Sequence, residues 1–155
     1  MPESYLVIFN SQGQNVLSNA SLTNVVYNVN WTSFLPMKYK KFRCKFVFKS
    51  LDANIILTDN GFVRMNTGKI NVFSGDQMTS NIGIIYPVLT NTTAGSLRSY
   101  YNSTNNDNND FTMSYPINNQ ITLSLKTFAG VDMGNMPNYT LILSLVGVDD
   151  DELDN

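Results

Sequence analysis

Apolar and cationic side chains alternate through residues 38–49, which read Lys-Tyr-Lys-Lys-Phe-Arg-Cys-Lys-Phe-Val-Phe-Lys. With a period of two, one face of this segment is apolar and carries Phe42, Cys44, Phe46 and Phe48. The opposite face, interrupted only by Val47, is cationic and carries Lys41, Arg43, Lys45 and Lys49. A helical period of 3.6 would scatter the apolar residues around a cylinder, and aromatic residues favour strands. The pattern therefore predicts a β-strand with one buried face and one basic face.

Other segments of the chain show the same alternation, or an apolar run of strand length. In residues 23–31 the apolar side chains at positions 25, 27, 29 and 31 alternate with asparagines at positions 24, 28 and 30. This alternation predicts one buried and one solvated face. No segment shows a convincing helical stripe. The further predicted strands are residues 5–9, 23–31, 54–58, 62–65, 69–73, 82–89, 97–101, 111–115, 121–127 and 139–148.

The residues between these strands are typical of turns and loops. Asp59-Asn60-Gly61 suits positive φ angles and predicts a tight turn, while Pro87 predicts an edge strand or one that ends early. Residues 102–110, which are mostly asparagine and aspartate, predict a long loop that is either exposed or disordered, and residues 129–138 predict a second long connection. Uneven spacing of this kind suits a Greek-key or jelly-roll sandwich better than a meander.

The fold class that follows is all-β, a single-domain antiparallel β-sandwich of jelly-roll-like topology. With 155 residues and 43% hydrophobic side chains the chain is long enough to enclose one core. We expect residues 1–148 to form this domain and residues 149–155 to form an acidic, flexible tail.

Composition argues against most catalytic classes. Histidine is absent and Cys44 is the sole cysteine, which excludes triads with a histidine base, histidine-containing zinc sites and intrachain disulfides. Cys44 falls on the apolar face of its strand, so we expect it to act as a small buried hydrophobe. The carboxylates outside the tail are scattered over loops, without a pair placed for acid and base chemistry. We therefore expect a protein that is not an enzyme and has no cofactor and no metal site.

The N-terminus and the lengths of the apolar stretches suggest where the protein is made. The N-terminus lacks the basic start and apolar run of a secretory signal, and no stretch approaches the roughly 20 apolar residues that span a bilayer. We expect synthesis in the cytoplasm and no membrane span.

Charge is distributed unevenly, although the net charge is only −2. Six of the ten basic residues lie in residues 38–49, and five of the twelve acidic residues lie in the tail: Asp149, Asp150, Asp151, Glu152 and Asp154. The basic strand face is either simply solvated or faces an acidic partner. Nucleic acid is a less favoured partner, because a single-strand binder displays aromatic and cationic side chains on the same face, whereas here they lie on opposite faces. Further candidate contacts are two tyrosines beside the asparagine-rich loop, Tyr100 and Tyr101, and two methionines in the second long connection, Met133 and Met136.

Three stretches of the chain resemble a known class of proteins. Residues 29–50, residues 121–125 (Ile-Thr-Leu-Ser-Leu) and residues 136–143 (Met-Pro-Asn-Tyr-Thr-Leu-Ile-Leu) are similar to small single-jelly-roll structural proteins of double-stranded DNA viruses of the giant-virus and virophage kind. The resemblance covers about half of the chain and lies in strand patterns. It implies a minor capsid or penton-type protein without an active site. A chain of 155 residues is compact for a decorated penton protein, which leaves cement and minor capsid roles equally open.

These observations lead to two hypotheses about function. The first is a structural protein of the virion that binds copies of itself or other capsid proteins, with the basic strand and the acidic tail as complementary surfaces. The alternative is a carbohydrate- or receptor-binding β-sandwich, such as a fibre head or a lectin-like module, with a sugar ligand held by loop side chains.

Overall fold

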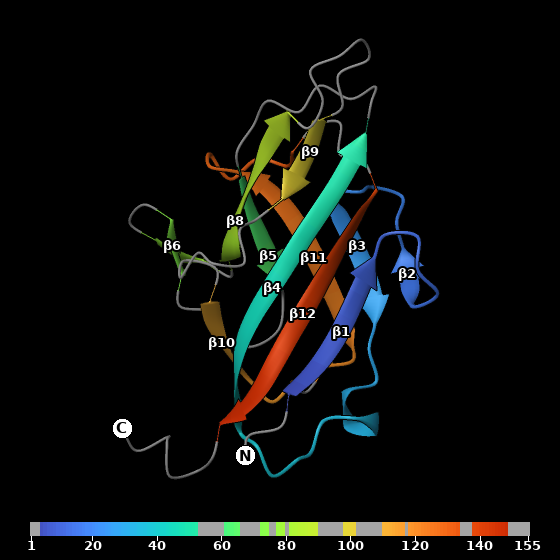
Figure 1. Cartoon of the computed structure of the whole chain (residues 1–155), viewed down its shortest axis with the longest axis vertical. Helices are drawn as coiled ribbons and strands as arrows, with labels where there is room; N and C mark the ends of the chain where they lie inside the picture. The colour runs from blue at the N-terminus through green and yellow to red at the C-terminus, as the bar shows by residue number, and fades with distance from the viewer. Residues whose placement is uncertain are drawn as a thin grey trace.

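The computed structural model describes residues 4–52, 61–65, 72–74, 77–79, 81–89, 98–101, 110–116, 118–133 and 138–148. In this part of the chain the regular structure is β-strand, apart from one 3-10 turn, η1 (Trp31–Ser33). Two antiparallel sheets pack face to face as a sandwich (Figure 1). The predicted all-β sandwich is confirmed.

The front sheet faces the viewer in Figure 1 and is built around the two longest strands, β4 (Lys41–Asp52) and β12 (Tyr139–Val148). β12 lies between β1 (Ser4–Asn10) and β4. The other edge of β4 pairs with β10 (Asp110–Ser114) along its first half and with β9 (Arg98–Tyr101) along its second half.

The back sheet runs in the order β5 (Gly61–Met65), β11 (Gln120–Thr127), β3 (Asn24–Asn28), β2 (Val16–Ser18). A separate hairpin, β6 (Val72–Ser74) with β7 (Gln77–Thr79), lies beside the sandwich.

β8 (Asn81–Leu89) connects the two sheets at one side of the sandwich. Its residues from Asn81 to Ile85 pair with β5 of the back sheet, and those from Tyr86 to Leu89 pair with β9 of the front sheet. Pro87 lies in this second half, opposite Tyr100, where β9 is the strand's sole partner among the described residues. The strand continues past the proline to Leu89, so it does not end early. The other predicted alternative, an edge position, holds locally, because Pro87 is paired on one side and its missing N–H is tolerated there.

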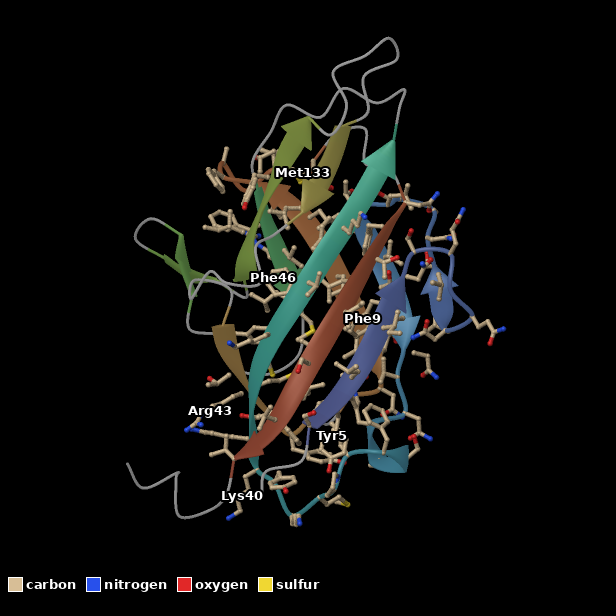
Figure 2. The ribbon with its side chains drawn as sticks, in the orientation of Figure 1. Tyr5, Phe9, Lys40, Arg43, Phe46 and Met133 are labelled. Atoms are coloured by element: carbon tan, nitrogen blue, oxygen red, sulfur yellow. The ribbon has the colours of Figure 1, made fainter. Side chains whose placement is uncertain are left out.

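The core lies between the sheets and includes the apolar face of β4. Phe42, Phe46 and Phe48 are at most 2% exposed, and the neighbouring β12 places Leu143 opposite Phe46 and Leu141 opposite Phe48. From the back sheet, β11 contributes a matching row of buried side chains: Ile121, Leu123 and Leu125. The predicted register of the basic strand is thus confirmed (Figure 2).

Some strand predictions differ from the structure. β3 ends at Asn28, and Trp31, predicted to close that strand, begins η1 instead, with its indole Nε1 donating a hydrogen bond to the Asn118 carbonyl at 3.1 Å. The short strands β2 and β7 were not predicted, because three residues are too few to show a period. The predicted strand at residues 54–58 lies outside the described residues, as do two residues of the predicted turn, Asp59 and Asn60.

Candidate interaction surface

The outer face of the front sheet brings the basic strand face together with side chains from three other strands. Register fixes the rows that cross this face from β1 through β12 and β4 to β10. One row runs Ser4, Val146, Arg43, Thr112, and the next runs Leu6, Ser144, Lys45, Asp110. A third row runs Ile8, Ile142, Val47. We call the face formed by these rows the outer sheet face.

The basic residues form a line along β4. Lys41, Arg43, Lys45 and Lys49 are all exposed, as the alternation predicted. Alternate residues of a strand are about 7 Å apart, so the first three cations form an evenly spaced row, in which Figure 2 shows Arg43 extending away from the sandwich. Lys41 and Arg43 lie opposite Ser114 and Thr112 of β10, whose hydroxyl-bearing side chains are half-buried.

A cavity of about 460 Å³ lies at the basic end of this face, over β10, β4 and β12. Four polar residues line it, Arg43, Lys45, Thr112 and Ser144, and the rest of the lining is Val146 together with the buried Phe111 and Cys44. Cations beside hydroxyl donors in a concave site suit a carboxylate or another anionic group of a partner. Because of this cavity, the basic end of the sheet can bind a partner side chain better than a flat strand face could.

Aliphatic side chains cover the rest of the outer sheet face, toward β1. Leu6 is 66% exposed and Ile8 is 58% exposed, and Val47 is 39% exposed. Ile142 lies half-buried between Ile8 and Val47 in one row. Exposed aliphatic residues gathered in one place on a sheet mark an interaction site more often than single ones do. Residues 5–9 are apolar without alternation, so a strand formed by them has two apolar faces. One face enters the core and the other lies on the outer sheet face.

The end of β12 places the acidic segment next to the basic row. Val148, the last residue of β12, pairs with Lys41. The chain therefore enters residues 149–155 beside the first cation of the row. The acidic residues themselves lie outside the described residues: Asp149, Asp150, Asp151, Glu152 and Asp154.

A smaller polar groove of about 260 Å³ lies at the opposite end of β12 and β4. Asn10, Gln12, Lys49, Asn138 and Thr140 line it, together with Ser50 and Tyr139. Asn10 donates a hydrogen bond from Nδ2 to Oγ1 of Thr140 at 2.9 Å. The buried hydroxyl of Ser50, which also lines the groove, has no hydrogen-bond partner among the described residues.

Cys44 and Met133, both buried, are not contact residues. Cys44 is 1% exposed, and burial raises the pKa of its thiol to about 12, as befits the predicted small hydrophobe rather than a nucleophile. Met133 is 2% exposed, so its prediction as a loop contact is wrong (Figure 2). The cause is local: Asp132 forms a β-bridge with Lys126, and the Met133 N–H donates to the Leu125 carbonyl at 3.1 Å, which directs the methionine side chain into the core.

The remaining predicted loop contacts lie partly or wholly outside the described residues. Tyr100 and Tyr101 lie in β9, which corresponds to the predicted strand at residues 97–101, and the structure describes their backbone only. Met136 lies outside the described residues.

Lys126 and Asp132 form an ion pair at the far end of β11. The hydrogen bond from Lys126, with a second one from Asn24, holds the pKa of the exposed Asp132 carboxyl below its ordinary value. The pair fastens the turn after β11 and is remote from the outer sheet face.

Within the described ranges, no three metal-ligating side chains gather in one place, and no helix is long and apolar enough to cross a bilayer. No protein-family model matches the chain, and no curated protein shows significant sequence similarity to it.

Proposed function

We propose that this protein is a structural component of a viral shell, of the minor capsid, penton or cement type, and acts by binding copies of itself or other shell proteins in the virion. The observation that carries the proposal is the outer sheet face, where exposed cations and exposed aliphatic side chains stand side by side on one sheet. The resemblance of the strand patterns to single-jelly-roll viral proteins supports the viral setting. Shell assembly requires no catalytic group and no cofactor.

The composition of this face suits a protein partner. Specific interfaces combine an apolar centre with a polar, charged rim. On the outer sheet face, Ile8, Ile142 and Val47 form an apolar row, and Arg43 and Lys45 lie beside it around the 460 Å³ cavity. A partner that inserts an acidic side chain into the cavity would also cover the aliphatic row.

The acidic segment of a neighbouring copy is the partner group that we propose for the basic row. It carries five carboxylates, whereas the row carries Lys41, Arg43 and Lys45 within about 14 Å. A head-to-tail contact between the segment of one copy and the row of the next would link copies in series. The attraction between exposed charges is screened over about 8 Å at physiological salt, so this contact should weaken as salt rises.

The test is co-purification with viral particles, together with assembly of the isolated protein. We expect a variant with Lys41→Gln, Arg43→Gln and Lys45→Gln, and a chain that lacks residues 149–155, each to reduce association. The matched control is Lys38→Gln with Lys40→Gln, which removes exposed cations that precede β4. Absence of the protein from purified particles would contradict the function. Unchanged association of both test variants would contradict the charge pairing alone.

A nucleic-acid partner would give a different result in the same assay. Contacts with phosphates lower the logarithm of the affinity by about 0.9 per decade of salt for each cation engaged. Loss of binding in the triple variant, with no effect of deleting residues 149–155, would indicate nucleic acid rather than a neighbouring copy.

The polar groove of about 260 Å³ favours a second candidate function, carbohydrate or receptor binding. Its amide and hydroxyl side chains offer donors and acceptors suited to sugar hydroxyls, and among them is the Ser50 hydroxyl, for which the described residues supply no hydrogen-bond partner. A glycan array with the wild type and with Gln12→Ala, which changes an exposed groove residue, tests this function. No binding by the wild type would exclude it on that array.

A further inference from the structure

β1 is an open sheet edge that is unusually well suited to pairing. It is seven residues long, has no charged residue and no proline, and within the described part of the chain it pairs with β12 alone. Natural edge strands are commonly protected by charge, proline, a bulge or very short length. β1 has none of these protections, and its side chains Leu6 and Ile8 are among the most exposed aliphatic residues of the sandwich.

The hydrogen bonds of β1 show which backbone groups face the open edge. The N–H of Ser11 donates to the Tyr139 carbonyl at 3.0 Å, in register with the pairing of β1 and β12. In an antiparallel pair, bonded and non-bonded residues alternate, so Phe9, Val7 and Tyr5 direct their backbone groups toward β12. Leu6 and Ile8 then direct their N–H and C=O groups toward the open edge. The same residues whose side chains are exposed also offer backbone groups that no other described strand pairs with.

The sequence of β1 is symmetric in chemical character about Val7. Reading outward from Val7 in either direction, the strand has an aliphatic, an aromatic and then a polar residue: Leu6, Tyr5 and Ser4 on one side, and Ile8, Phe9 and Asn10 on the other. In an antiparallel pair of two β1 strands with the two-fold axis at Val7, Leu6 would lie opposite Ile8 of the second copy. Each class of side chain would meet its own class, as a self-complementary two-fold interface requires.

We propose that two copies of this chain dimerise by antiparallel pairing of β1 with β1, with the axis at Val7 and perpendicular to the sheet. The two front sheets then become one continuous sheet across the dimer. Leu6 and Ile8 of each copy exchange both backbone hydrogen bonds with Ile8 and Leu6 of the other. The side chains of these four residues form one apolar cluster at the centre of the joined outer sheet faces.

Charge favours a second copy as the occupant. Neither β1 nor the outward residues of β12 carry a charge, so these two strands offer no group that would attract an acidic or a basic partner. The cationic rows of the two copies would stand on the two β4 strands, which are five strand spacings apart, or about 24 Å. That separation exceeds the Debye length of about 8 Å at physiological salt, so the rows would not oppose the pairing.

Area also suits a reversible dimer. β1 extends about 23 Å at 3.3 Å per residue, and β2, which carries the exposed Leu17, forms the edge of the back sheet at the same side of the sandwich (Figure 1). A contact of this length across both sheets buries on the order of 500 Å² per copy, or about 1,000 Å² in total. This is the lower end for a specific interface, so we expect association that depends on concentration.

This dimer extends the proposed function by naming one surface and its partner, but it does not depend on the viral setting. The first experiment is sedimentation equilibrium of the wild-type chain, where the mass should rise from 17.4 kDa toward twice that value with concentration. Hydrogen exchange at both ends of that range should show slower exchange of the Leu6 and Ile8 amides in the dimer, by roughly tenfold or more. The amides of Val7 and Phe9, which face β12, should be protected at both concentrations.

The second experiment places charges at the proposed contact. Leu6→Lys with Ile8→Lys sets like charges directly opposite each other across the axis, which destabilises a strand pair, so the variant should remain a monomer. Val131→Lys is the matched control, because Val131 is an aliphatic residue of similar exposure (63%) that lies in the turn after β11, remote from the outer sheet face, and this variant should still dimerise.

A wild type that is monomeric at every concentration would overturn the proposal. So would a dimer in which the Leu6 and Ile8 amides exchange as fast as in the monomer, since the contact would then lie elsewhere. If the double lysine variant fails to fold, exchange on the wild type still decides the question. Capture of a different shell protein along β1, with no self-association, would also contradict it. Failure to co-purify with particles, with the dimer intact, would count against the proposed function alone.

Discussion

The hydroxyl of Tyr27 donates a hydrogen bond to the hydroxyl of Tyr139 at 3.0 Å, and this bond joins the two sheets through the core. Tyr27 belongs to β3 of the back sheet, where its ring meets Phe9 edge to face at 4.9 Å between centroids. Tyr139 begins β12 of the front sheet, and its ring stacks on Phe48 at 5.1 Å. Both tyrosines are buried, so their hydroxyls depend on each other in place of water.

Removing one of these hydroxyls should destabilise the sandwich. Tyr27→Phe leaves the buried Tyr139 hydroxyl without its donor, and we expect the free energy of unfolding to fall by about 1–3 kcal/mol. The double variant Tyr27→Phe with Tyr139→Phe should lose less than the sum of the two single losses, because neither group is then left unpaired. Urea unfolding of the four proteins of this cycle measures the coupling. Strict additivity would mean that the bond contributes nothing.

Stability should decrease at alkaline pH. Burial raises the pKa of Cys44 and that of Tyr27 to about 12, and it raises the pKa of Tyr139 as well. The unfolded chain releases these protons near the ordinary values, from about pH 9 for the thiol and about pH 10 for the phenols, while the folded chain retains them. The unfolded state then binds fewer protons, so the free energy of unfolding falls as pH rises, by up to about 1.4 kcal/mol per pH unit for each group.

The contribution of these groups is fully present below about pH 9 and is lost as pH rises to about 12. Denaturant unfolding at a series of pH values measures this loss. Cys44→Ala should remove the part that begins near pH 9, and Tyr27→Phe should make the profile shallower above pH 10. Identical slopes for wild type and variants would contradict the assignment.

Neighbouring residues of β4 should respond in opposite ways to truncation. Phe46, 2% exposed, faces the core, whereas Val47, 39% exposed, lies on the outer sheet face. We expect Phe46→Ala to cost about 3–5 kcal/mol and Val47→Ala to cost less than about 1 kcal/mol. Thermal melting of the two variants side by side gives the result. Comparable losses would mean that the two faces of the strand are not distinguished as the register requires.

Two glycines lie where a methyl group has no space. A Cβ at Gly61 would overlap the backbone carbonyl of Lys126 on the adjacent β11, and a Cβ at Gly147 would lie 2.6 Å from Cδ1 of the Tyr39 ring. A ring can shift more readily than a paired strand, so Gly61→Ala should destabilise more than Gly147→Ala, for which we expect about 1–3 kcal/mol. Chemical denaturation of both variants tests the order, and the reverse order would contradict it.

The sequence predicted most of the fold where a strand was long enough to show its period. Through β4 the alternation identified the buried and exposed residues correctly from Lys41 to Lys49. The alternation of residues 23–31 correctly indicated that Trp31 is buried but wrongly placed it in a strand, because one buried residue at the start of η1 continues the alternation just as a last inward strand residue would. The pairing of the strands could not be predicted from local patterns. Nothing in the sequence of β8, for example, shows that its two halves belong to different sheets.

The candidate site was predicted in part. The basic row followed from periodicity, and its exposure is confirmed, whereas its partner remains a prediction. The aliphatic row was not predicted, because Ile8, Ile142 and Val47 come from distant parts of the chain and lie side by side only through the pairing of β1, β12 and β4. Met133 was assigned to a surface loop by its polar surroundings, but a β-bridge five residues beyond β11 directs it inward.

The position of β12 between β1 and β4 has a consequence for biosynthesis. During translation β1 and β4 emerge early, but the strand that pairs with both of them is the last of the sandwich to be made. Until residues 139–148 leave the ribosome, the apolar faces around Phe9 and Phe46 lack their central neighbour. Pairing between distant parts of a chain is slow, on the scale of milliseconds to seconds, and exposes surfaces prone to aggregation. The front sheet can therefore close only after β12 has been synthesised, and until then the nascent chain exposes apolar surface that the folded sheet covers.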